Sequence, residues 1–140
     1  MIENNFIKVY DKMRIGFYRR IFSKVKEREG SLSATELFSV EIIQSLNRPT
    51  IKEFADFIGI SMPGATYKVN MLESKGYVKR VRSEEDRRES YLELTQRYYD
   101  YAQINEQIIS DLFDKANERF SADEMALLDK MFLFLADELD

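Results

Sequence analysis

The chain has 140 residues, of which 44% are hydrophobic and 33% charged, and its formal net charge is −4 at pH 7. This length fits one compact domain without room for a second complete core. Because the chain contains neither cysteine nor histidine, it lacks thiolate chemistry, zinc–thiolate sites and the commonest general base and metal ligand. An enzyme would have to use carboxylates alone, and no carboxylate pair stands out, so we expect no catalysis, cofactor or metal.

We expect neither a targeting signal nor a membrane-spanning segment in this chain. Met1-Ile2-Glu3-Asn4 lacks a basic segment followed by an apolar run, which argues against a signal peptide. The longest apolar stretch, Met131 to Ala136, is too short to cross a bilayer. We therefore expect a soluble, cytoplasmic protein that does not enter a membrane.

The negative charge is unevenly distributed along the chain. Residues 1–30 carry eight basic and four acidic side chains, and residues 68–88 carry seven and four. Residues 111–140 carry three basic and nine acidic side chains. Since charges act over about 8 Å at physiological salt, a phosphate backbone responds to the local charge and not to the total. The charge distribution is therefore compatible with nucleic-acid binding.

The first half of the chain is predicted to be helical. Apolar residues at steps of three and four from Ile2 to Val25 predict a helix of roughly seven turns that ends at Gly30. A capping box at residues 33–36 begins a second helix, which runs to about Leu46. Asn47-Arg48-Pro49 then interrupts the helical pattern.

Two shorter helices follow the interruption. A second capping box, at residues 50–53, begins a helix that ends at Ile58. Gly59 and Ile60 form a tight turn, and Ser61 caps the next helix, which tolerates Pro63 in its first turn. This helix is predicted to run to Lys75 and to stop at Gly76.

The second half begins with two short strands, residues 77–82 and 90–94, joined by a polar loop at residues 83–89. Thr95 is a candidate cap for a long helix, and a third capping box at residues 121–124 begins the last helix. The predicted order is α-α-α-α-β-β-α-α, a mainly α fold with a small β-hairpin.

Residues 51–70 fit a helix-turn-helix. Ala55 is small where a second helix would cross closely, and Gly59 tolerates positive φ in the turn. A second helix presented in this way is able to enter the major groove of DNA. The alternative is a simple helical hairpin in a core. The apolar residues expected to lock the two helices together are Phe54, Ile58, Ile60, Ala65 and Val69.

The hairpin that follows fits a wing. Seven basic residues fall within residues 68–88, and Arg87 and Arg88 lie near the hairpin tip. An arginine at such a tip is able to enter a narrow minor groove. Asp86 fits this interpretation if it orients a neighbouring guanidinium through a bidentate pair. The alternative is a solvated charged loop.

Several of these segments together resemble the MarR (multiple antibiotic resistance regulator) family. They are Gly59-Ile60-Ser61, Thr66, residues 72–80, residues 85–88 and Leu94-Thr95. The most specific piece is the Asp-Arg-Arg wing followed by a strand ending in Leu-Thr, and the resemblance covers nearly the whole chain. It implies a winged helix-turn-helix with flanking dimerisation helices, which binds double-stranded DNA as a homodimer.

The resemblance also implies a set of DNA-binding residues. Arg88 matches the wing arginine that enters the minor groove, and Asp86 matches the acid that orients it. The predicted DNA-binding residues are Ser61, Pro63, Ala65, Thr66, Lys68, Arg82, Asp86, Arg87 and Arg88. Family members often have polar residues at the positions of Met62, Pro63 and Gly64, and an apolar residue at that of Lys68, so base preference does not transfer.

The segments that flank the predicted winged helix-turn-helix (residues 33–95) are residues 1–30 and 96–140. Their aromatic and aliphatic stripes, with Phe6, Tyr10, Phe17, Phe132 and Phe134, predict self-association, the alternative being that they complete one core. A two-fold dimer would bind a pseudo-palindrome with half-sites about one helical turn apart.

Many members of the family bind small aromatic or anionic effectors between the dimerisation helices and the DNA-reading part. Tyr18, Phe22, Phe38 and Tyr91 are candidates to line such a crevice, but core packing is the commoner role of such aromatics, so no ligand residue is assigned. The leading hypothesis is a ligand-responsive repressor. The competing hypothesis is a winged-helix protein-interaction module without DNA binding, which the acidic total favours and the basic wing disfavours.

Overall fold

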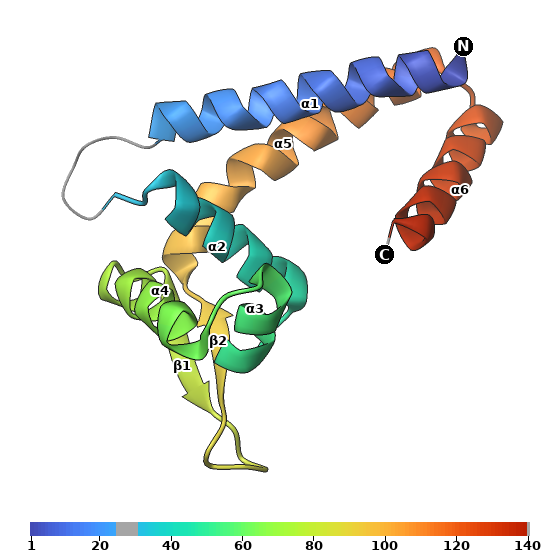
Figure 1. The fold of residues 1–140 in the computed structure, drawn as a ribbon. Helices are drawn as coiled ribbons and strands as arrows, with labels where there is room; N and C mark the ends of the chain where they lie inside the picture. The colour runs from blue at the N-terminus through green and yellow to red at the C-terminus, as the bar shows by residue number, and fades with distance from the viewer. Residues whose placement is uncertain (25–30, 140) are drawn as a thin grey trace. The chain divides into compact units, whose positions relative to one another are not determined.

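A computed structural model describes residues 1–24 and 31–139 of the chain. This part contains six helices and one two-stranded sheet, and the predicted element order and fold class are confirmed (Figure 1). The end of the first predicted helix, including Val25 and Gly30, lies outside the described residues. The elements are α1 (Ile2–Lys24), α2 (Ala34–Leu46), α3 (Ile51–Ile58), α4 (Met62–Ser74), β1 (Val78–Arg82), β2 (Ser90–Leu94), α5 (Gln96–Arg119) and α6 (Ala122–Glu138).

The chain divides into two compact units, residues 1–99 and residues 100–140, so that α5 begins in the first and continues in the second. The first unit carries 18 basic and 14 acidic side chains, a net charge of +4. The second carries 3 basic and 11 acidic side chains, a net charge of −8. The excess of basic side chains and the excess of acidic side chains therefore belong to different units.

Two of the three predicted capping boxes are complete. At the start of α2 the Ser33 hydroxyl accepts from the Glu36 amide, and the Glu36 carboxylate accepts from the Ser33 amide. The box at the start of α6 has the same reciprocal pattern. The box at α3 is one-sided, which corrects the prediction. The Thr50 hydroxyl accepts from the Glu53 amide but donates to the Glu53 carboxylate, because a hydroxyl is able to do both.

The core of the first unit lies where α2, α3, α4 and β2 meet. Full burial of each large apolar side chain contributes about 1.5–3 kcal/mol to folding. Ala55 of α3 and Ala65 of α4 are also fully buried, and the two helices pack directly against each other. The most deeply buried large side chains are Leu37, Val40, Ile43, Phe54, Val69, Leu72, Val78 and Leu92.

The sheet is an antiparallel hairpin whose register pairs Val78 with Leu94 and Arg82 with Ser90. Its β2 edge is joined to the segment that precedes α3, since the Leu92 amide donates to the Pro49 carbonyl at 2.8 Å. An isolated bridge between Thr50 and Tyr91 continues this pairing. The hairpin is therefore fixed to the start of α3, and Figure 1 shows it extending from there to a loop at its tip.

Large apolar side chains on α1 and in the second unit are widely exposed. Among the described residues, ten such side chains lie between Met1 and Phe22, and ten more lie between Ile108 and Leu139. No described residue of α6 is buried, although Phe113 and Phe132 pack edge to face with ring centroids 6.2 Å apart. None of the described helices combines the length and apolar character needed to cross a membrane.

Candidate nucleic-acid interface

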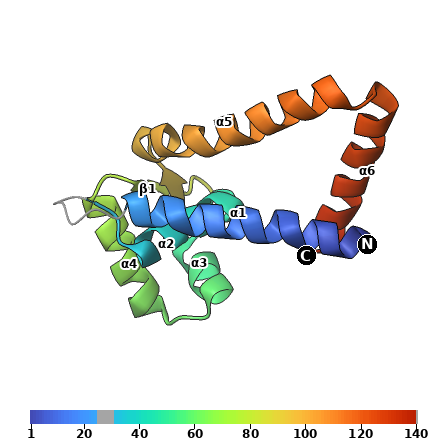
Figure 2. The ribbon, with the colours of Figure 1, turned by 90° about the horizontal axis from the view of Figure 1, so that it is seen from above.

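The helix-turn-helix forms as the sequence predicts. Gly59 ends α3 with a φ of 70°, the left-handed backbone that glycine adopts without a Cβ penalty. Ser61 caps α4 by accepting a hydrogen bond of 3.2 Å from the Gly64 amide, and Pro63 occupies the first turn. In the view of Figure 2, α3 and α4 are joined by this turn. Helix α4 is therefore the candidate recognition helix.

One face of α4 is buried, and the burial corrects one predicted DNA contact. Ala65, Val69 and Leu72 have no exposed surface. The Ala65 side chain therefore cannot contact DNA; its small size serves the close packing of α4 on α3. The remaining predicted residues of this segment are at least partly accessible: Ser61 and Pro63 are exposed, and Thr66 and Lys68 are both half-buried. Tyr67, at 67% exposure, also lies on the accessible face.

The wing loop is organised by its own hydrogen bonds. The Ser83 amide donates to the Glu89 carbonyl, and the Glu89 amide donates to the Asp86 carbonyl, each at 3.0 Å. The Ser83 hydroxyl accepts from the Asp86 amide at 3.3 Å. The three wing arginines of the predicted set are exposed: Arg82, Arg87 and Arg88.

Asp86 holds the wing in a different way from the one predicted. Its carboxylate accepts a 2.9 Å hydrogen bond from the backbone amide of Arg88. The guanidinium of Arg88 comes no closer than 3.9 Å, which is too long for a hydrogen bond. A bidentate pair between Asp86 and Arg88 is therefore not formed, although the two groups remain within ion-pair distance. Asp86 fixes the loop backbone, and the Arg88 side chain, 94% exposed, remains available to a ligand.

A hollow of about 290 Å³ lies where the start of α3, the start of α4 and the hairpin meet. Its lining includes three cationic side chains and one carboxylate, a charge balance that suits a phosphate group. The sequence predicts Arg88 at this site, but it does not single out Lys52 or Arg80. The sequence signals for Arg80 are the excess of basic residues in 68–88 and its place at the end of the resembling segment 72–80. The hollow is lined by Thr50, Ile51, Lys52, Met62, Arg80, Arg88, Glu89 and Ser90.

Arg80 also connects the wing to the recognition helix. Its guanidinium donates to the Asn70 side-chain carbonyl and lies 3.3 Å from the Glu73 carboxylate. Strand β1 and helix α4 are thereby linked by charged and polar contacts beside the hollow. The charges of Arg80 and Glu73 offset each other in this contact.

The aromatic candidates for an effector crevice occupy several environments. The Phe38 ring lies 6.3 Å from that of Phe17, and the Arg48 guanidinium lies 5.4 Å from the Tyr91 ring centroid. Tyr18 and Phe22 are exposed. Within the described ranges, no cluster of three or more acidic, histidine or cysteine side chains could hold a metal ion.

Comparison with known proteins identifies the fold. The family model "MarR family" matches residues 32–90. FabT of Streptococcus pneumoniae, solved in complex with DNA, is 23% identical over 96% of both chains, with a TM-score of 0.55. The adhesin competence repressor AdcR of Streptococcus pyogenes is 18% identical over 99% of this chain and 98% of its own, with a TM-score of 0.59.

A mutant of MepR from a multidrug-resistant clinical isolate of S. aureus is 12% identical over 96% of this chain and 97% of its own, with a TM-score of 0.68. No curated protein sequence matches the chain. The matched residues contain α2, the helix-turn-helix and the hairpin up to the start of β2. The MarR family model therefore matches the part of the chain that contains the winged helix-turn-helix, and the whole chain has the same fold as these solved structures.

Proposed function

We propose that this protein is a sequence-specific transcription regulator that binds double-stranded DNA as a homodimer and represses transcription until a small ligand releases it. The observation that carries the proposal is the shared hollow, where the start of the recognition helix and Arg88 of the wing border one cationic surface. FabT, which shares the fold, was solved with DNA, AdcR is named a repressor, and PcaV of Streptomyces coelicolor was solved with its natural ligand.

In this proposal the two parts of the interface read different features of the duplex. The accessible face of α4, with Pro63, Thr66 and Tyr67, enters the major groove, where base pairs present distinct donors and acceptors. Arg88 enters the adjacent minor groove, whose negative potential attracts a guanidinium. Arg82 and Arg87 contact phosphates, which position the protein without reading sequence.

The exposed apolar side chains of the terminal helices support a homodimer. Phe6 of α1 is 50% exposed, and Leu133 and Phe134 of α6 are each 61% exposed. Monomeric proteins seldom expose so many large apolar side chains on neighbouring turns, and such surfaces mark protein–protein interfaces. A two-fold dimer would present two recognition helices to a pseudo-palindromic operator. A DNA-binding regulator of this kind would act in the cytoplasm.

The proposal is tested by replacing Arg88 with alanine. We expect Arg88→Ala to weaken binding to a selected duplex by about 1–3 kcal/mol in a gel-shift titration, with the circular dichroism spectrum and the oligomeric state unchanged. Arg119→Ala removes the same charge from the last turn of α5 and serves as the control. Unchanged affinity in Arg88→Ala would rule out the assigned role of the wing.

The competing function is a winged-helix protein-interaction module, and the net charge of −8 on residues 100–140 is the observation that favours it. Salt dependence separates the two functions. A DNA-binding protein with several phosphate contacts loses affinity steeply between about 50 and 200 mM salt, because bound counterions are released. Absence of binding to any duplex at the lower salt concentration would favour the interaction module.

A further inference from the structure

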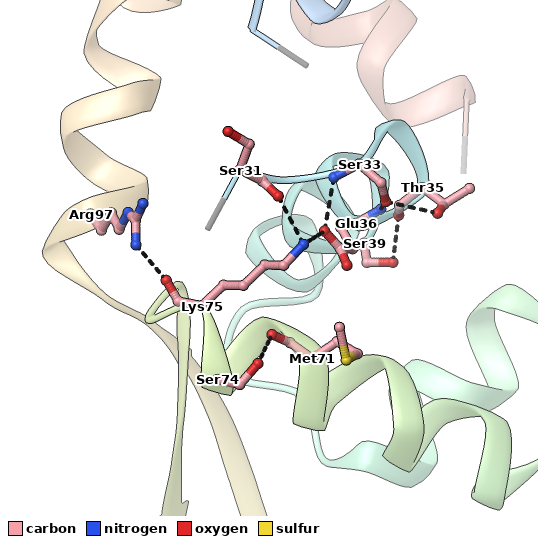
Figure 3. A network of polar contacts seen from close by, with 9 residues as sticks. All are labelled: Ser31, Ser33, Thr35, Glu36, Ser39, Met71, Ser74, Lys75 and Arg97. Carbon is pink, nitrogen blue, oxygen red and sulfur yellow. Dashed lines mark hydrogen bonds and ion pairs between the residues drawn. The ribbon is translucent and has the colours of Figure 1, made fainter. Parts of the chain in front are cut away.

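The C-terminal end of α4 is held by polar contacts to two other helices (Figure 3). Lys75, the residue that caps α4, donates from Nζ to the Ser31 carbonyl at 2.8 Å and to Glu36 Oε2 at 2.7 Å. Arg97, in the first turn of α5, donates from Nη1 to the Lys75 carbonyl at 2.6 Å. The end of the candidate recognition helix is thus joined to the start of α2 and to the start of α5.

The Lys75–Glu36 ion pair is largely withdrawn from water. The two side chains are 21% and 15% exposed, whereas those of the surface pair Lys52–Asp56 are 76% and 69% exposed. The same oxygen of Glu36 also accepts the Ser33 amide at 2.8 Å, so its position is set by two donors. A pair with this burial and these partners has a defined geometry, which a solvated surface pair does not.

Helix α4 is also held by core packing and by the contacts of Arg80 with Asn70 and Glu73. Ala65, Val69 and Leu72 pack into the core, and apolar packing is non-directional. Helix α4 has 13 residues and is therefore about 20 Å long. A tilt of about 10° at its C-terminal end displaces its N-terminal end by roughly 3 Å. A hydrogen bond to a base tolerates a change of only a few tenths of an ångström in the distance between donor and acceptor. Recognition of bases by α4 therefore depends on the tilt of this helix, on which the contacts at Lys75 act.

We propose that Lys75 and Arg97 are positioning residues for DNA recognition, which fasten the end of α4 to α2 and α5 and so set the angle at which α4 meets the duplex. The inference rests on the proposed function, in which α4 reads DNA. Neither residue contacts DNA in this proposal. The Lys75 ammonium is directed at Ser31 and Glu36, and the Arg97 guanidinium is bonded to the Lys75 carbonyl and lies 4.6 Å from the Tyr77 ring centroid.

The test replaces both charges at once, with the variant Glu36→Gln/Lys75→Met. Removal of one partner alone would leave a buried charge unpaired and destabilise the fold, whereas removal of both avoids this cost. Glutamine retains a side-chain oxygen that accepts the Ser33 amide, so the α2 cap is kept. We expect the affinity for a duplex selected from a random-sequence pool to fall about tenfold, the scale of one lost base contact, while the thermal midpoint stays near that of wild type.

The salt dependence identifies how the affinity is lost. A lost phosphate contact lowers the slope of log K against log salt by about 0.9, whereas a misdirected helix leaves the slope unchanged. We expect an unchanged slope for the double variant and also for Arg97→Met. The control variant Lys130→Met/Glu138→Gln removes the same two kinds of charge from α6. Wild-type affinity in the folded double variant, or a reduced slope, would overturn the proposal.

A measurement without DNA separates this inference from the proposed function. Residual dipolar couplings of backbone amides report the direction of α4 relative to α2 in the free protein. We expect them to change in Glu36→Gln/Lys75→Met and to stay constant in the α6 control. Unchanged couplings would refute the positioning role whether or not the protein binds DNA. Failure of wild-type protein to bind any duplex, with couplings that do change, would refute the proposed function and leave only the effect of these contacts on the direction of α4.

Discussion

The backbone amide of Leu92 donates a 2.8 Å hydrogen bond to the carbonyl of Pro49. Strand β2 is therefore paired on both sides, with β1 along one edge and with residues 49 and 50 along the other. A two-stranded hairpin alone is marginally stable in water. The additional bond fixes the wing to the start of α3, so that the direction of the wing follows that of the helix-turn-helix.

The core of the first unit is tested by two phenylalanines on the same helix. Phe54 of α3 has no exposed surface, whereas Phe57 is 62% exposed. We expect Phe54→Ala to lower the free energy of unfolding by about 3–5 kcal/mol, because burial is lost and a cavity remains. Phe57→Ala should change it by no more than about 0.5 kcal/mol. Urea denaturation followed by circular dichroism measures both, and equal losses would contradict the placement of α3.

The turn of the helix-turn-helix is tested at Gly59. A Cβ added there meets nothing within 4 Å, so any cost of substitution arises from its φ of 70° and not from a clash. We expect Gly59→Ala to destabilise the fold by about 1–2 kcal/mol, the cost of the left-handed backbone for an L-residue. Gly59→Asn should cost less, because asparagine tolerates this conformation. If both variants were as stable as wild type in thermal denaturation, the turn geometry would be wrong.

Acid stability is tested at Glu36. Burial raises the pKa of its carboxyl, but the hydrogen bond and charge of Lys75 and the bonds from Ser33 outweigh burial, so the pKa lies below its ordinary value of 4.5. Because the folded-state pKa is the lower one, this contribution to stability is complete above pH 4.5 and is lost as the pH falls through the folded-state pKa.

The variant Glu36→Gln removes this part of the pH dependence. We expect the difference in unfolding free energy between wild type and Glu36→Gln to be constant near neutral pH and to shrink below pH 4.5. Urea denaturation at a series of pH values measures this difference. A difference independent of pH down to strongly acidic solution would show that the carboxylate does not interact with Lys75.

The proposed dimer is tested by introducing a negatively charged side chain on α1. We expect wild type to sediment as a dimer and Phe6→Glu to sediment as a monomer, because a carboxylate cannot be buried in an apolar interface without a large desolvation cost. Tyr67→Glu, on the accessible face of α4, places the same charge outside the proposed interface and should remain dimeric. Sedimentation equilibrium at several concentrations provides the measurement. A monomeric wild-type protein at all of them would exclude the dimer.

Most of the fold is predictable because its signals are local. The capping residues Ser33, Ser61 and Ser121, together with Gly59, define where helices begin and end, and each acts through its own backbone or a residue three positions away. The element order follows from these boundaries. The prediction for the Thr50 box is wrong because the same residue types permit two hydrogen-bond patterns, and the choice between them depends on local geometry that the sequence pattern does not specify.

The site is less completely predictable, because its errors and omissions involve three-dimensional contacts. Ala65 belongs to the predicted DNA-binding set by its position in the motif, although it is buried against α3. Asp86 is expected from the sequence to hold a guanidinium, but its carboxylate bonds to a backbone amide two residues away. The contacts of Lys75 with Ser31 and Glu36 join segments 44 and 39 positions apart and leave no periodic signal in the sequence.

The separation of charge between residues 1–99 and residues 100–140 has a practical consequence for handling the protein. With a total net charge of −4, the chain would be expected to bind an anion-exchange resin and to pass unretained through a column of heparin, which is a sulfated polymer. A sulfated polymer interacts with the nearest charges within about 8 Å, however, and the first unit has an excess of cations. We therefore expect retention on both resins during chromatography at low ionic strength.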